Sequence, residues 1–248
     1  MLAKRIVTTL MLNNGILFRT KNFIPDYRYT LNFIDMWSVD EVVVIDITRD
    51  LDFEDKKKKI FFEQLRKISA NACVPLTAGG GIRTLSNIEK LLKNGADKVL
   101  LNTICFKNIK FIHEAAKEFG SQCIVVSVDA KLYQKLYYVM MNYGKNRSSY
   151  TINDYIKIIE DNNGGEIFLQ SVDRDGSLLG YDMQLLEQIN KIQLPLIVSS
   201  GAGNWEHVKK ILENKYVSAA SLTNIFHFTE NSIKNLKNYI KKFITIRE

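Results

Sequence analysis

The feature that most constrains the fold of this chain is an internal repeat. The segment PLTAGGGIRTLSNIEKLLKNGADKVLLNT, which begins at Pro75, is matched by PLIVSSGAGNWEHVKKILENKYVSAASLTN, which begins at Pro195. Two further pairs match in the same way: EVVVIDITRD with EIFLQSVDRD, and RIVTTLM with CIVVSVD. Each half of the chain therefore contains four matching strand-helix units, as expected for a barrel built from two half-barrels.

Short β-branched runs alternate with amphipathic helical stretches along the chain. In LSNIEKLLKNGA, for example, Ile88, Leu91 and Leu92 fall on one helical face. The alternation occurs eight times in 248 residues, which predicts an α/β fold, a (β/α)8 TIM barrel, rather than an open sheet. We expect a single barrel domain over residues 1–248, with half-barrels over about 1–120 and 121–248.

Composition argues against several other classes of protein. The net charge is +7, but the lysines are scattered along helical faces without interleaved aromatic residues, so we expect no nucleic-acid partner. No run of 18 apolar residues occurs and the first apolar stretch is too short for a signal peptide, so we expect no membrane span. The three cysteines are widely spaced and the histidines lack metal-ligand spacing. We therefore expect reduced thiols, a cytoplasmic location, no metal and no cofactor.

Two glycine-rich turns follow predicted strands at equivalent points of the repeat. AGGGIR contains Gly79, Gly80 and Gly81, and SSGAGN contains Ser199 and Gly201. Backbone N–H groups in such turns approach an anion closely, and the N-terminus of the next helix adds a favourable dipole. A single loop of this kind is equally well explained as a tight turn. Two such loops at equivalent points of the repeat predict a long substrate with a phosphate at each end.

Carboxylates follow three of the predicted strands. Asp46, Asp129 and Asp175 stand after strands two, five and six, and Asp173 lies beside the last. In a (β/α)8 barrel the loops after the strands form the active site, so these residues are candidates for acid, base or positioning groups. Helix capping and turn formation are the alternative roles.

Four charged residues mark the opposite ends of the strands. Arg5, Glu41, Lys98 and Glu166 each stand immediately before an apolar run, in strands one, two, four and six. Their positions predict a mixed-charge ring at the amino-terminal mouth of the barrel. Such a ring suits a gate, although ordinary barrels also close this end with salt bridges.

Together these motifs resemble the cyclase subunit of imidazole glycerol phosphate synthase, the (β/α)8 partner of a glutaminase. The resemblance covers almost the whole chain and rests on MLAKRI, AGGGI, GADKVLLNT, FGSQCIVVSVDAK and, most specifically, S-x-D-R-D-G-x-x-x-G-Y-D from Ser171 to Asp182. In that family, ammonia from the glutaminase enters at the amino-terminal face and crosses the barrel. It then reacts with a bisphosphorylated nucleotide to give imidazole glycerol phosphate, for histidine biosynthesis, and an aminoimidazole carboxamide ribotide.

The resemblance implies a heterodimer with a glutaminase, a phosphorylated small-molecule substrate, and roles for individual residues. It assigns the ammonia gate to Arg5, Glu41, Lys98 and Glu166, and catalysis to Asp129 and Asp175. The positions that it assigns to binding of the substrate and its phosphates are Arg19, Asp46, Gly79, Gly80, Gly81, Asn102, Thr103, Gly176, Ser199, Gly201 and Asn224.

One catalytic aspartate of the family is missing from this chain. The family has an aspartate after the first strand, where this chain reads TLMLNNG and has Met11, and the repeat pairs Met11 with Asp129. A thioether cannot transfer protons. The loop that follows is several residues shorter than in the family and has Arg19 in place of a lysine. These departures leave the fold prediction unchanged and indicate a divergent paralogue.

Three functions fit this pattern. The chain is a cyclase in which Asp129, Asp175 and water share the proton transfers, or it keeps the docking face and channel but delivers ammonia to another acceptor. For this second function, the reaction that we consider is amidine formation on nucleotide-linked sugars, for surface polysaccharide or flagellin glycans. A non-catalytic scaffold that activates the glutaminase allosterically is the third. All three require a glutaminase partner, with Asp97 beside Lys98 as an interface residue.

Overall fold

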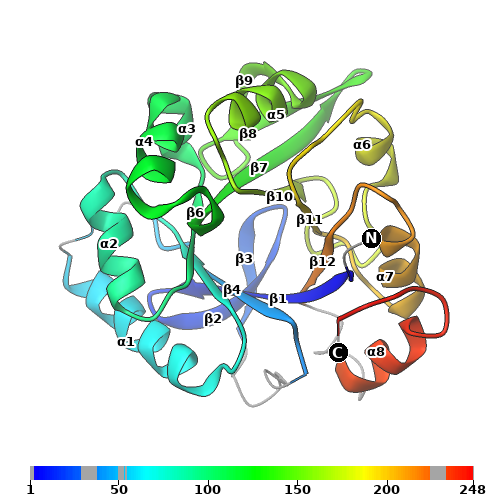
Figure 1. Cartoon of the computed structure of the whole chain (residues 1–248), viewed down its shortest axis with the longest axis horizontal. Helices are drawn as coiled ribbons and strands as arrows, with labels where there is room; N and C mark the ends of the chain where they lie inside the picture. The colour runs from blue at the N-terminus through cyan, green and yellow to red at the C-terminus, as the bar shows by residue number, and fades with distance from the viewer. Residues whose placement is uncertain (1–2, 29–37, 50–52, 54, 224–232, 248) are drawn as a thin grey trace.

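A computed structural model describes residues 3–28, 38–49, 53, 55–223 and 233–247. Within this part of the chain, eight parallel strands close into a barrel, which confirms the (β/α)8 prediction (Figure 1). The barrel strands are β1 (Arg5–Asn13), β4 (Glu41–Asp46), β5 (Leu76–Gly79), β6 (Lys98–Leu101), β7 (Ile124–Tyr133), β10 (Glu166–Ser171), β11 (Leu196–Ser199) and β12 (Ala219–Leu222).

The barrel closes because β1 pairs with both β4 and β12, while β7 pairs with both β6 and β10. In the resulting order, β5 and β11 are four strands apart on either path around the barrel. The two glycine-rich turns that follow these strands therefore lie on opposite sides of the mouth, as the repeat predicts.

Helices surround the barrel, as Figure 1 shows. They are α1 (Lys56–Asn71), α2 (Leu85–Lys93), α3 (Thr103–Lys107), α4 (Lys110–Phe119), α5 (Ile152–Asp161), α6 (Met183–Glu187), α7 (Trp205–Leu212) and α8 (Ile233–Ile240). The repeat extends to their capping residues. Thr84 begins α2 by accepting a hydrogen bond from the Asn87 N–H, and Asn204, 120 residues later, begins α7 in the same way.

Side chains of the barrel strands alternate between the helices and the barrel interior. On β1, Ile6 and Leu10 pack in the large core between strands and helices, whereas Val7 faces inward. The inward residues form a separate apolar layer: Val7, Val43, Leu100, Val125, Phe168, Ile197 and Ala219, with Ile45 packed against it. This layer separates the two ends of the barrel.

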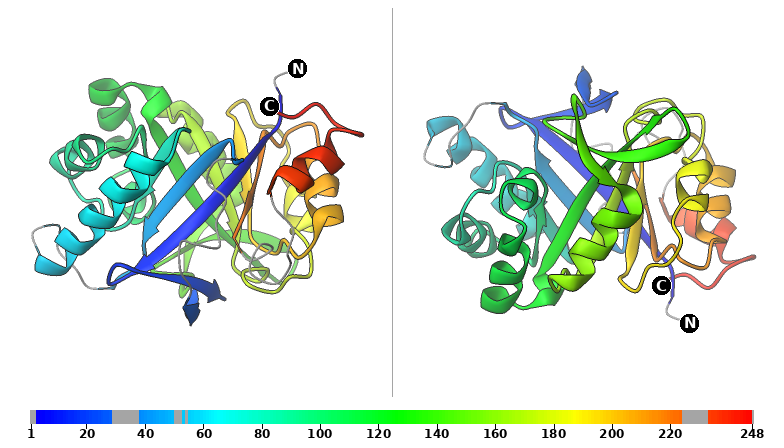
Figure 2. Two further views of the ribbon diagram at one scale, coloured as in Figure 1. Left: turned by 90° about the horizontal axis from the view of Figure 1, so that it is seen from below. Right: turned by 90° about the horizontal axis from the view of Figure 1, so that it is seen from above.

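Two β-hairpin extensions stand at the carboxyl end of the barrel, where the sequence indicated only polar turns and a loop. β1 continues into β2 (Ile16–Lys21) and β3 (Ile24–Arg28), and β7 continues into β8 (Leu136–Met141) and β9 (Asn146–Thr151). Figure 2 shows the first extension at the end of the molecule opposite to both termini.

The extensions belong to the internal repeat. Asn22 and Phe23 connect β2 to β3 with φ of 50° and 62°, the values of a two-residue type I′ hairpin turn, in which asparagine is favoured. At the matching positions Asn142 and Tyr143 also have positive φ, 50° and 61°, but they begin a longer loop that runs to Lys145 before β9 starts. The two half-barrels thus share their hairpins as well as their strands.

Among the helices that the structure describes, none is long and apolar enough to cross a membrane.

Candidate functional site

The four charged residues that precede strands form a closed ring at the amino-terminal end of the barrel. Arg5 donates to Glu41 over 2.8 Å and also to Glu166. Lys98 donates to the same two carboxylates, over 3.0 Å in each case. Both carboxylates are nearly fully buried, and the cations are partly exposed. The arrangement alternates cation and anion, which the sequence predicted from position alone.

At the opposite end of the barrel, Asp129 is held by three hydrogen-bond donors. Asn102 donates to Oδ2 over 2.8 Å, while Ser127 and Gln170 donate to Oδ1 over 3.1 and 3.0 Å. The residue is 5% exposed. A carboxylate accepts about four hydrogen bonds, so one acceptor position on Oδ2 is left for a substrate.

Burial raises the pKa of Asp129, and the negative charge of Asp175 raises it further. The hydrogen bonds from Asn102, Gln170 and Ser127 act against this rise, because they favour the charged form. The pKa of Asp175 is raised by burial as well, against hydrogen bonds from the Phe23 N–H and the Thr20 hydroxyl. Two mutually repelling carboxylates with raised pKa values are suited to acid–base catalysis.

Met11 lies near Asp175, at the inner end of the first hairpin extension. The Thr20 hydroxyl is 3.5 Å from the Met11 sulfur and also hydrogen-bonds the Asp175 carboxylate. The hydroxyl has one proton, and a carboxylate is a far stronger acceptor than a thioether. Met11 therefore contributes bulk to the site and no proton chemistry.

The first hairpin packs directly on the loop that contains Asp175. The Phe23 N–H donates to the Asp175 carboxylate over 2.9 Å. Gly176 has φ of +68°, and a Cβ there would lie 2.3 Å from the Thr20 carbonyl oxygen, so a side chain would push the hairpin away. Gly176 thus permits a close contact between the two loops, a more local role than the substrate contact predicted for it.

Two residues assigned to substrate binding are engaged elsewhere. Asp46 lies on the helix side of β4, where it forms a buried ion pair with Lys58 over 2.9 Å. Arg19 forms an ion pair with Asp26 of the neighbouring strand over 2.6 Å. The prediction that Asp46 faces the substrate therefore needs correction, because its alternation with inward-facing Ile45 turns it away from the interior.

The remaining assigned residues lie at the carboxyl ends of strands. Gly79 closes β5 and Ser199 closes β11, with Gly80, Gly81 and Gly201 in the turns that follow. Thr103 begins α3 at an exposed position. Asn102, assigned to phosphate binding, donates its side-chain amide to Asp129. Asn224 lies outside the described residues.

Sequence patterns did not point to Gln170, Ser127, Thr20 or Lys58. The alternation of strand side chains could have found Gln170 and Ser127. Each lies two residues after an inward-facing residue of its strand, Phe168 and Val125 respectively. Lys58 belongs to the lysine run KKKKI, which indicated a solvated helix face, yet its side chain is 3% exposed. Only the tertiary contact with Asp46 identifies it.

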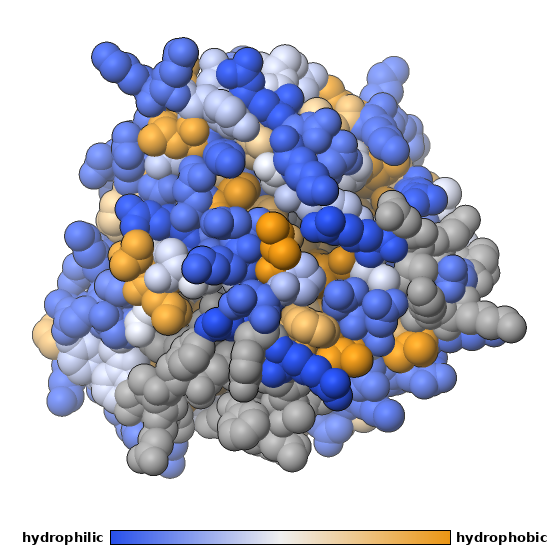
Figure 3. Space-filling model, turned by 180° about the vertical axis from the view of Figure 1, so that it is seen from behind, coloured by the Kyte–Doolittle hydropathy of each residue, from blue (hydrophilic) through white to orange (hydrophobic). Residues whose placement is uncertain are grey.

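Figure 3 shows the face of the molecule that contains the mouth and the hairpins, where hydrophilic residues predominate.

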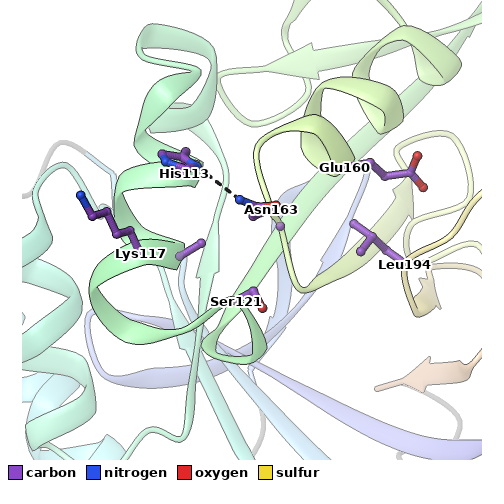
Figure 4. A pocket seen from close by; sticks show the side chains of 8 residues that line it. His113, Lys117, Ser121, Glu160, Asn163 and Leu194 are labelled. Carbon is purple, nitrogen blue, oxygen red and sulfur yellow. Dashed lines mark hydrogen bonds between the residues drawn. The ribbon is translucent and has the colours of Figure 1, made fainter.

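A separate cleft of about 590 Å³ lies near the other end of the barrel, between α4 and α5 (Figure 4). Its lining residues include His113, Lys117, Ser121, Glu160 and Asn163, and none of them belongs to the predicted site. Within the described chain, no group of three His, Cys, Asp or Glu residues is placed to hold a metal ion.

Comparison with known proteins identifies the family to which this chain belongs. A family model described as "Histidine biosynthesis protein" matches residues 9–232. The protein named "Imidazole glycerol phosphate synthase subunit HisF" from Hydrogenobaculum sp. (strain Y04AAS1) is 37% identical, over 98% of this chain and 97% of that protein. Its namesakes from Natranaerobius thermophilus and Dictyoglomus thermophilum are 35% and 37% identical with the same coverage. The chain therefore belongs to the family of HisF subunits of imidazole glycerol phosphate synthase.

Proposed function

We propose that this chain is the ammonia-accepting synthase subunit of a glutamine amidotransferase. The observation that best supports this is the closed ring of Arg5, Glu41, Lys98 and Glu166. Burying four charges is costly, and apolar residues of similar volume often stabilise a protein as well or better. A ring of this kind is therefore better explained by a function at the amino-terminal face than by stability.

In this proposal a glutaminase docks on the ring face and releases ammonia there. Ammonia passes the ring and the apolar layer around Phe168 and arrives beside Asp129. A substrate with two phosphates spans the mouth, held by the turns after β5 and β11. Asp129 and Asp175 exchange protons with it, because both are buried carboxyl groups with raised pKa values.

The family reaction, cyclisation to imidazole glycerol phosphate, is the first candidate for the chemistry. Met11 favours a second candidate, in which ammonia is delivered to a different acceptor. Amidine formation on a nucleotide-linked sugar is one such reaction, and it requires an anionic substrate and an ammonia source but not the strand-one aspartate. The ring and the phosphate turns serve both reactions equally.

The decisive experiment supplies ammonium salts and the bisphosphorylated ribulosyl nucleotide to the purified chain and follows imidazole glycerol phosphate. Turnover supports the first candidate. Absence of turnover, together with consumption of a nucleotide-linked sugar when its modifying enzyme is added, supports the second. Co-purification with a glutaminase tests the partner, and a chain that stays monomeric beside every glutaminase of its own cell contradicts the proposal.

Glu166→Gln is expected to uncouple glutamine from the synthase reaction. It removes one anion from the ring and leaves Arg5 and Lys98 in excess, which hinders passage of ammonia past the ring. In the complex with the glutaminase, product formed per glutamine hydrolysed should fall about tenfold, the effect of 1.4 kcal/mol on a barrier. Turnover with external ammonium, which reaches the mouth from solvent, should be nearly unchanged.

Glu213→Gln is the matched control, because Glu213 is exposed at the end of α7 on the same face but outside the ring. It should change neither quantity. Equal losses with glutamine and with ammonium in Glu166→Gln would show that the ring acts on the fold instead of on ammonia.

A further inference from the structure

A buried lysine lies directly behind the glycine turn that follows β5. Lys58 Nζ donates to Asp46 Oδ2 over 2.9 Å and to the Gly80 carbonyl oxygen over 2.8 Å. The Lys58 and Asp46 side chains are each only 3% exposed. The ammonium group therefore links the end of β4 to the backbone of the turn after β5.

Two aromatic rings also contact this ammonium. Its nitrogen lies 4.5 Å from the ring centroids of both Phe53 and Phe61, a distance at which a cation is attracted to an aromatic face. Two rings and two oxygen acceptors restrain the ammonium, which can in turn restrain the Gly80 carbonyl.

The peptide that receives this hydrogen bond is unusually free to rotate. It joins Gly80, with φ of +108°, to Gly81, with φ of +76°. Neither residue has a side chain to oppose a peptide flip. Because the peptide is planar and trans, a flip exchanges the directions of the Gly80 carbonyl and the Gly81 N–H.

The direction of that peptide decides whether the turn attracts or repels an anion. With the Gly80 carbonyl bound to Lys58, the Gly81 N–H points to the opposite side, and Gly81 itself is exposed. After a flip, a carbonyl oxygen would face the anion in place of a donor. A Cβ at Gly80 would lie 2.2 Å from the Asp46 carbonyl oxygen, so the backbone of the turn packs closely against the end of β4. This close approach brings the Gly80 carbonyl within reach of Lys58.

We infer that Lys58 is a positioning residue for phosphate binding: it locks the Gly80–Gly81 peptide so that the Gly81 N–H is presented to the anion. The inference rests on the proposed function in one respect, namely that this turn binds a phosphate. Asp46 takes part by holding the lysine rather than by touching the substrate, which accounts for its position on the helix side of β4.

The test is a titration of the isotopically labelled protein with inorganic phosphate, followed at the backbone amides of Gly81 and Gly201. Lys58→Met keeps the length of the side chain and removes its hydrogen bonds. Its apparent phosphate affinity at Gly81 should fall about tenfold, which corresponds to the loss of one charge-assisted hydrogen bond. The response of Gly201, in the turn after β11, should be unchanged. Lys58→Arg should retain most of the affinity.

Lys237→Met is the matched control for the loss of a buried ion pair. Lys237 binds Asp40 over 2.6 Å, and both side chains are largely buried, near the amino-terminal end of β4. This variant should lower the melting temperature as Lys58→Met does, without weakening phosphate binding at Gly81. If Lys58→Met does not fold, the double variant Asp46→Asn/Lys58→Met leaves no unpaired carboxylate and should show the same loss at Gly81.

The positioning role of Lys58 and the phosphate site itself are refuted by different results. If wild type and Lys58→Met bind phosphate equally well at Gly81, the positioning role is overturned while the phosphate site stands. If the Gly81 amide of the wild-type protein does not respond to phosphate, the phosphate site itself is refuted and the positioning role with it.

Discussion

Asp129→Asn is expected to reduce ammonia-dependent turnover by about 10²–10⁴-fold, the usual contribution of a general acid or base. The asparagine fits the same space and its oxygen can still accept from Ser127 and Gln170, while its NH2 group replaces the acceptor for Asn102. It cannot take up or release a proton. The loss should appear in kcat more than in KM, because the group acts on the reacting atoms. Steady-state kinetics with ammonium salts and the acceptor identified for the wild-type chain measure it.

The same variant is expected to be more stable than the wild-type protein at neutral pH. Burial raises the folded-state pKa of Asp129, so the stability linked to this group is complete below its unfolded pKa. That stability is lost as pH rises through the raised folded pKa. Asparagine does not ionise and avoids the loss. Each kcal/mol gained should raise the melting temperature by roughly 2–4 °C, and the advantage should shrink as pH falls from 8 to 4.

Asp173→Asn is the control for Asp129→Asn. Asp173 is exposed and accepts a hydrogen bond from the Leu132 N–H over 3.2 Å, so its replacement should leave turnover unchanged. A variant Asp129→Asn that melts at a lower temperature and retains its turnover would contradict both parts of the prediction.

Met11→Asp is expected to raise the rate of imidazole glycerol phosphate formation about 10²-fold above that of the parent chain. The new carboxylate takes the place of the sulfur, 3.5 Å from the Thr20 hydroxyl, which can donate to it. It also stands close to Asp175, so the two like charges raise each other's pKa and favour one bound proton. The rate is measured with ammonium and the ribulosyl nucleotide.

Met11→Asn separates ionisation from polarity, since it offers the same shape and hydrogen bonds without a titratable proton. Only the aspartate variant should gain activity, and its pH–rate profile should contain one titration beyond those of Asp129 and Asp175, which Met11→Asn lacks. A parent chain that already turns over the ribulosyl nucleotide rapidly, with no gain in Met11→Asp, would show that Asp129 and Asp175 suffice for the family reaction.

Much of the fold could be predicted from the sequence, because the repeat and the strand-helix alternation depend on local patterns. The eight predicted strand runs correspond to the eight barrel strands, and the offset between Gly81 and Gly201 places their turns on opposite sides of the mouth. The ring was predictable as well, since each member stands at the first position of its strand and a barrel brings those positions together.

The hairpin extensions and the contact of Lys58 with the turn after β5 could not be predicted from local sequence patterns. The Asn14-Gly15 pair is a strong hairpin signal, but only pairing with β2 distinguishes it from an ordinary polar turn. The role of Lys58 depends on which way one side chain turns within a run of four lysines. Such orientation is decided by the ion pair with Asp46 on another element, which no local pattern connects to the helix.

The duplicated hairpins also mark where the two half-barrels have ceased to be equivalent. At matching positions one half has Asp129 and Gln170, and the other has Met11 and Ile45. One side of the mouth therefore holds a buried carboxylate and an amide donor, while the matching positions on the other side are apolar. Two phosphate turns related by symmetry would accept an elongated substrate in either direction. Under the proposed function, the lost equivalence removes that ambiguity and leaves one productive orientation, with the reacting atoms toward β7 and β10.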